Sequence, residues 1–145
     1  MSTPNYIFFY GTLRQNELNY KIIKNDKRVS FLGNVATKNK YSFIMINRTR
    51  MYPFITKATY KGHKKVHVIG DLYEIDSEER KSFIHEMDNF ENKYKRKIIQ
   101  VVDKNGKVIN AYTYFIKDKW IKHLEDFLKP NGLEEFVFIN TGSYV

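Results

Sequence analysis

The stretch Gln100–Phe115, QVVDKNGKVINAYTYF, gives the clearest local indication of the fold. Its dipeptide Asn105–Gly106 stands between two segments in which apolar and polar side chains alternate. Alternation places every second side chain on the same face of a strand, and Asn-Gly favours a tight turn with positive φ angles. The stretch therefore predicts an antiparallel β-hairpin.

Outward from this hairpin, aromatic and β-branched residues predict further strands. These strands are Tyr6–Leu13, Tyr41–Ile46 and Val66–Ile75. Pro53 lies in a short apolar piece between the second and third of them. Because proline donates no backbone hydrogen bond, that piece is expected at a sheet edge or in a loop.

Apolar residues at helical spacing predict three helices, over residues 16–25, 75–92 and 117–132. Pro130 and Gly132 are stop signals for the last of them. About six strands and three helices indicate an α+β domain or a small mixed β-barrel. A length of 145 residues suits a single domain, residues 1–145.

Composition excludes several classes of protein. The chain has no cysteine, which excludes a disulfide scaffold, a thiolate zinc site and a cysteine nucleophile, and favours a cytoplasmic location. The first residues lack the features of a signal peptide, and no apolar run is long enough to span a membrane. The four histidines show no converging pattern, so no metal site is expected.

The net charge of +9 raises the question of a nucleic-acid partner. The lysines and arginines are spread over the whole chain, and no nucleic-acid motif accompanies them. Solvated lysines on loops and strand ends are the favoured interpretation, so nucleic-acid binding is not expected.

The helix predicted over residues 75–92 carries one carboxylate in an unusual place. Asp76 is a suitable N-cap, with Glu79 as its capping-box partner. At about 100° per residue, Glu91 falls within roughly 20° of the apolar Ile84 and would point inward. Burial raises the pKa of an unpartnered carboxyl, which suits a proton shuttle near neutral pH. The alternative is that the helix ends near Asp88 and Glu91 turns into solvent. Asp88 and Glu91 are three positions apart and could share a face as a carboxylate pair, but we expect Asp88 to cap the next segment instead.

The stretch Tyr10–Leu13, YGTL, places a glycine directly after an apolar strand. Taken alone, this pattern is typical of an ordinary turn between a strand and a helix. The other interpretation is that Gly11 lets the backbone approach a ligand.

The order of several motifs resembles the gamma-glutamylcyclotransferase-like family, most closely its gamma-glutamylamine cyclotransferase branch. The matching segments, in chain order, are FFYGTLR, YPF, GDLYEI, MDNFE, YKRKIIQVV and TGSYV. They extend over nearly the whole chain. Three positions depart from the family pattern: Met87 replaces a leucine, Asp71 replaces a glutamate, and Ser143 replaces the acidic residue of the closing segment.

The resemblance implies a small mixed β-barrel flanked by helices. It implies that Glu91 is the catalytic acid/base and that Tyr10, Gly11, Thr12 and Leu13 line the substrate site. The expected reaction converts a γ-glutamyl amide, with a γ-glutamylamine such as γ-glutamyl-ε-lysine favoured, into 5-oxoproline and a free amine. It needs no cofactor. The alternatives are a γ-glutamyl dipeptide substrate, or a non-catalytic binding protein with a basic surface.

Overall fold

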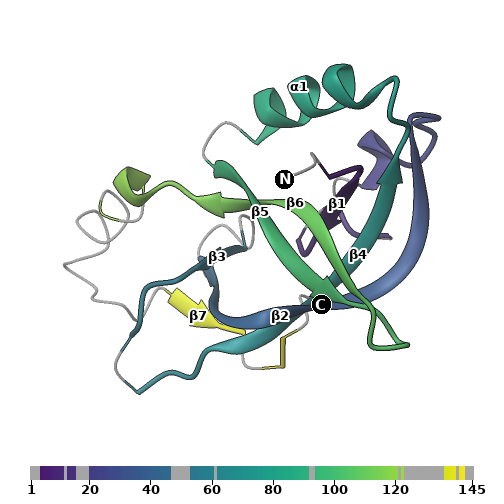
Figure 1. The fold of residues 1–145 in the computed structure, drawn as a ribbon. Coiled ribbons are helices and arrows are strands. Elements are labelled where there is room, and N and C mark those ends of the chain that lie inside the picture. The colour runs from purple at the N-terminus through teal and green to yellow at the C-terminus, as the bar shows by residue number, and fades with distance from the viewer. Residues whose placement is uncertain are drawn as a thin grey trace.

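The computed structural model describes residues 4–11, 13–15, 20–46, 53–60, 62–91, 94–120, 122, 136–139 and 141–142. Strands dominate this part of the chain (Figure 1). The elements are β1 (Tyr6–Phe9), a 3₁₀ turn (Tyr20–Ile22), β2 (Val29–Ile46), β3 (Phe54–Thr56), β4 (Val66–Ile75), α1 (Arg80–Phe90), β5 (Tyr94–Val102), β6 (Val108–Ile116) and β7 (Phe136–Phe138).

Five of these strands close into a barrel, in the order β2-β4-β1-β6-β5. Antiparallel pairing of Ala36 with Val102 and of Thr37 with Val101 joins β5 back to β2. The β1–β6 pair is parallel and the other barrel pairs are antiparallel, so the sheet is mixed. β3 and β7 pair with the C-terminal part of β2. The predicted small mixed barrel is confirmed.

Alternation along the strands divides the apolar side chains into two clusters. The first cluster takes residues such as Phe8, Leu72 and Phe115 from strands all around the barrel, so it fills the barrel interior. The second cluster takes the opposite faces of β1, β4 and β6 and packs them against Phe83 and Met87 of α1. Helix α1 therefore covers the outer face of three strands, and its C-terminal end lies close to the start of β5 (Figure 1).

The predicted hairpin is confirmed as β5–β6. Gly106 adopts a φ of 80°, in the region that glycine enters without strain. The carboxylate of Asp103 accepts the backbone N–H groups of Asn105 and Lys107, both at 2.9 Å, which fixes the turn.

Other strand predictions were partly wrong. β1 ends at Phe9, four residues before the predicted end. β2 has 18 residues and begins at Val29, whereas the sequence predicted only its last six residues. Register shifts at Phe31/Gly33 and Ala36/Lys40 interrupt the alternation of side chains along β2, so its first part carries no period-two pattern. β4 matches its prediction, and β3 follows Pro53 at the edge of the sheet, as expected.

Two helix predictions need correction. Residues 20–25 form only the 3₁₀ turn and following turns, because Ile23 alone is buried there while Ile22 is 39% exposed. α1 begins at Arg80, and Asp76 instead accepts the N–H of Glu78 in a preceding turn, so the capping box was wrong. Residues 16–19 and most of the predicted helix 117–132 lie outside the described residues, and residues 118–120 are helical.

Candidate active site

Tyr10 leaves β1 at the end of the barrel and is almost completely buried. Its hydroxyl donates to the backbone carbonyl of Tyr114 at 2.5 Å, and its ring meets the Phe43 ring edge-on. Burial raises the pKa of Tyr10 well above its usual value, and the charges of Tyr94 and Glu91 raise it further. Tyr10 and Glu91, 81 positions apart in the sequence, are therefore close enough to interact electrostatically.

Glu91 occupies the C-cap position of α1, which continues past Asp88 and ends at Phe90, two residues before the end of the predicted segment. Its N–H donates to the Met87 carbonyl at 2.8 Å, and its carbonyl accepts the N–H of Tyr94 at 2.9 Å. These two bonds fix the backbone of Glu91 between α1 and β5.

The Glu91 side chain is partly buried, and its carboxyl has no side-chain hydrogen bond or ion pair to another described residue. Desolvation raises the pKa of Glu91 from its usual 4.5 to about 7. A carboxyl with such a pKa is present in both protonation states near neutral pH, as a proton shuttle requires.

Arg96, near the start of β5, pairs with Asp88 instead of Glu91. The Arg96–Asp88 distance is 3.6 Å, and the other carboxylate oxygen of Asp88 accepts the Tyr114 hydroxyl at 2.8 Å. Asp88 therefore lies within α1 and binds two side chains, and the expectation that it would cap the next segment was wrong. Burial and the bond to Asp88 raise the pKa of Tyr114, and the charge of Glu91 contributes.

Gly11 lies where the structure leaves no room for a side chain. A Cβ atom on Gly11 would stand 2.8 Å from Cγ of Pro53. The Gly11 carbonyl accepts the N–H of Arg14 at 3.0 Å, which closes a tight turn. Pro53 is held in turn by Tyr94, whose hydroxyl donates to the Pro53 carbonyl at 3.2 Å.

Leu13, also predicted as a site residue, is 3% exposed and packs in the cluster beneath α1. Only its backbone is therefore available to a ligand. Thr12 lies outside the described residues, as does Ser143. Sequence reasoning missed Pro53, Tyr94 and Tyr114, because their contacts with this site join distant parts of the chain.

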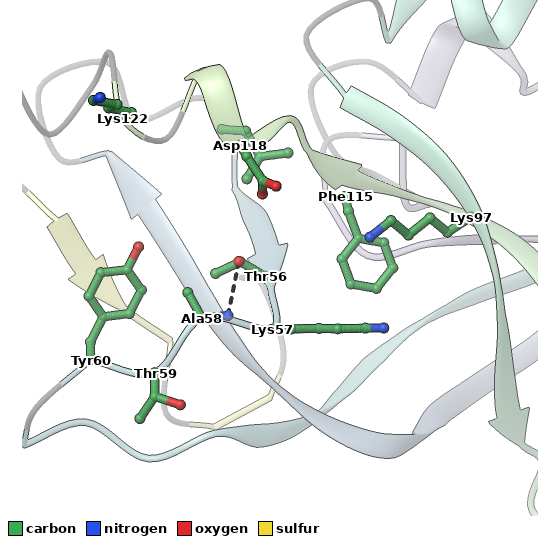
Figure 2. A pocket seen from close by; sticks show the side chains of 10 residues that line it. Thr56, Lys57, Ala58, Thr59, Tyr60, Lys97, Phe115, Asp118 and Lys122 are labelled. Carbon is green, nitrogen blue, oxygen red and sulfur yellow. Dashed lines mark hydrogen bonds between the residues drawn. The ribbon is translucent and has the colours of Figure 1, made fainter.

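A depression of about 670 Å³ lies beside the end of β3 (Figure 2). Its ionisable lining residues are Lys57, Lys97, Lys122 and Asp118. Figure 2 shows the Lys97 ammonium above the Phe115 ring, and the distance to the ring centroid is 4.9 Å. None of the predicted site residues lines this pocket, so the pocket is separate from the site that contains Tyr10 and Glu91.

Two classes of feature can be judged for the described ranges. Among those residues no group of three His, Asp or Glu side chains could hold a metal ion. No helix in the same part of the chain is long and apolar enough to cross a membrane.

The family model for gamma-glutamyl cyclotransferase, AIG2-like proteins matches residues 7–133. This match extends from β1 to β6 and includes Tyr10, Gly11 and Glu91. The chain belongs to the gamma-glutamyl cyclotransferase, AIG2-like family. The resemblance seen in the motifs is thus confirmed.

Relatives of this cyclotransferase-family chain agree with the assignment. A Methanocaldococcus jannaschii protein, named as a provisional gamma-glutamylcyclotransferase, is 32% identical over 76% of this chain and 82% of its own length. Gamma-glutamylaminecyclotransferase A of Danio rerio is 26% identical over 74% of this chain and 66% of its own length. The crystal structure of an AIG2-like protein from Mus musculus superposes with a TM-score of 0.68 at 21% identity, over 99% of this chain and 90% of that one. That likeness supports the fold.

Proposed function

We propose that this protein is a cyclotransferase that converts a γ-glutamyl amide into 5-oxoproline and a free amine. The observation that carries the proposal is Glu91, a desolvated carboxyl with a pKa of about 7, held beside Tyr10 at the start of the YGTL loop. The family and the names of its relatives support this class of reaction.

The reaction is an intramolecular acyl transfer. The α-nitrogen of the γ-glutamyl group attacks the γ-carbonyl carbon, a new C–N bond closes the five-membered ring, and the amide C–N bond breaks. Two protons leave the α-ammonium and two arrive at the departing amine, so the reaction balances without water or a redox partner. Glu91 carries each of these protons in turn, accepting it from the α-nitrogen and giving it to the leaving nitrogen.

The YGTL loop, Tyr10–Leu13, supplies the second part of the proposed mechanism. The buried side chains of Tyr10 and Leu13 anchor the loop, and the proposed contact with the substrate is made by its backbone N–H groups. Such groups can bind the α-carboxylate or the oxyanion of the tetrahedral intermediate. Holding the substrate folded brings the α-nitrogen onto the carbonyl, which lowers the entropic part of the barrier.

We favour a γ-glutamylamine such as γ-glutamyl-ε-lysine as the substrate, because the motifs around Glu91 match that branch and two further relatives, from rat and mouse, carry that name. The second candidate is a γ-glutamyl dipeptide. The net charge of +9 favours it, because a dipeptide leaves with a free carboxylate that a basic rim around the site would attract.

A screen of γ-glutamyl compounds with detection of 5-oxoproline tests the proposal. We expect release of 5-oxoproline by the wild-type protein and its loss in Glu91→Gln. Glu86→Gln is the matched control, because Glu86 lies on the same helix but binds Arg28 on the exposed side. Salt-sensitive binding to RNA or DNA without 5-oxoproline release would instead support the nucleic-acid alternative.

A further inference from the structure

Asp71 is a charged residue in the middle of β4, where its side chain is 3% exposed. β4 is flanked on both sides by barrel strands, with Phe9 of β1 and Asn34 of β2 opposite Asp71. Asp71 has the same parity along the strand as Tyr73 and Ile75, so it faces the outer cluster beneath α1. A carboxylate buried there is unfavourable unless it has partners.

Both partners of Asp71 come from the residues that directly follow the YGTL loop. One carboxylate oxygen accepts the backbone N–H of Gln15 at 2.7 Å. The other oxygen accepts the Nε–H of Arg14 at 3.3 Å. The N–H of Arg14 donates to the Gly11 carbonyl. The Arg14 residue that binds Asp71 through its side chain therefore also closes the turn that contains Gly11.

The YGTL loop is therefore held at both ends. On its N-terminal side, β1 and the Tyr10 hydroxyl attach it to the barrel. On its C-terminal side, Asp71 attaches it to β4. Charge-assisted hydrogen bonds of this kind are stronger than neutral ones, and their geometry is directional.

We propose that Asp71 is a positioning residue: it fixes the backbone of the YGTL loop so that the loop's N–H groups are already oriented toward the substrate. This inference rests on the proposed cyclotransferase function. Asp71 does not take part in proton transfer, because Glu91 lies on a different element and carries that role.

The variant Asp71→Asn tests the inference, because it keeps the side-chain shape and removes the charge that holds both donors. We expect kcat/KM for the γ-glutamyl substrate to fall by about 10- to 100-fold, as a small misplacement of a binding group does. The dissociation constant of 5-oxoproline should rise in parallel. The apparent pKa of the pH–rate profile should stay unchanged, because Glu91 keeps its surroundings. Asp71→Glu, which keeps the charge and both acceptor oxygens, should recover most of the activity.

Asp26→Asn is the matched control. Asp26 also accepts both an arginine side chain and a backbone N–H, those of Arg28, but none of these bonds reaches the YGTL loop. We expect this variant to lose stability without a change in kcat/KM. An equal kinetic loss in Asp26→Asn, or full activity in a folded Asp71→Asn, would overturn the inference. If Asp71→Asn does not fold, Arg14→Gln removes one of the two bonds and should lower kcat/KM by a few-fold.

A readout that does not need activity separates this inference from the proposed function. Amide hydrogen exchange of Gln15 should be faster in Asp71→Asn than in the wild type by tenfold or more, while the amides of β1 stay protected. Unchanged exchange at Gln15 would refute the anchoring role even in an active enzyme. If exchange at Gln15 is faster in Asp71→Asn but the wild-type protein releases no 5-oxoproline, the proposed function is refuted and the anchoring role of Asp71 stands.

Discussion

Asp71 and Glu91 are both carboxylates withdrawn from water, and their surroundings differ in one respect. Asp71 lies in a central strand and receives an arginine side chain and a backbone N–H. Glu91 lies where α1 ends, and no described side chain donates to its carboxyl, while Arg96, five residues on, pairs with Asp88. Hydrogen-bond donors, more than depth of burial, therefore decide what a buried carboxylate is suited to do.

A carboxylate with two fixed donors is suited to hold a loop, because its free energy is lowest while both bonds are kept. A carboxyl without donors keeps a raised pKa, about 7 for Glu91, and can exchange a proton at little cost near neutral pH.

The largest effect is expected for Glu91→Gln, which keeps the shape of the side chain and removes its proton exchange. Turnover should fall by about 10²–10⁴, measured as 5-oxoproline release at saturating substrate. The folded variant should still bind 5-oxoproline. A turnover close to that of the wild type would show that another group carries the proton.

The next effect concerns stability and pH. The pKa of Glu91 is raised in the folded state, so the folded protein binds a proton more tightly than the unfolded chain. The contribution of Glu91 to the free energy of unfolding is therefore neutral below about pH 4. As the pH rises from 4.5 to about 7, Glu91 lowers the free energy of unfolding, by at most about 3 kcal/mol.

Urea unfolding of the wild type and Glu91→Gln at pH 4, 6 and 8 measures this contribution. The difference in the free energy of unfolding should move in favour of the glutamine variant as the pH rises, and it should level off above about pH 8. A constant difference across this range would mean that the Glu91 carboxyl is not desolvated in the folded protein.

The hairpin could be predicted, and the helix end in part, because their signals are local. Asn105–Gly106 sets its turn from two adjacent residues. The spacing of seven residues from Ile84, nearly two helical turns, places Glu91 on the apolar face only if the helix persists, and the sequence left open a helix end near Asp88. The site was then completed by a resemblance spread over ordered motifs, which identified Tyr10 and Gly11.

The anchoring of the loop could not be predicted from local patterns. Asp71 meets Arg14 across 57 positions, and Pro53 fills the space at Gly11 across 42. Neither pair has a periodic signal in the sequence. Both contacts depend on how β4 pairs within the barrel and on how β3 pairs with β2 beside it. The first half of β2 was missed for a related reason, since its bulges remove the alternation that marks a strand.

A smaller effect is expected at Gly11, and it separates two reasons for the glycine. Gly11→Ala places a Cβ against the stiff ring of Pro53, so the turn must shift, and kcat/KM should fall by about tenfold or more. The double variant Gly11→Ala/Pro53→Ala removes that contact. Recovery of activity would show that Pro53 requires the glycine. If activity stays low, the added methyl group obstructs the substrate itself, as the backbone-approach interpretation predicts.

The smallest effect concerns the leaving group, since the roles proposed for Glu91 and for the YGTL loop concern the γ-glutamyl end that all candidate substrates share. Discrimination must then come from contacts beyond that end. We expect kcat/KM for γ-glutamyl-ε-lysine to exceed that for γ-glutamyl-alanine and for glutathione. A preference for either of the latter by about tenfold, roughly 1.4 kcal/mol of transition-state binding, would reverse this choice of substrate. Glu91→Gln should abolish all three activities, because the proton transfers do not depend on which amine departs.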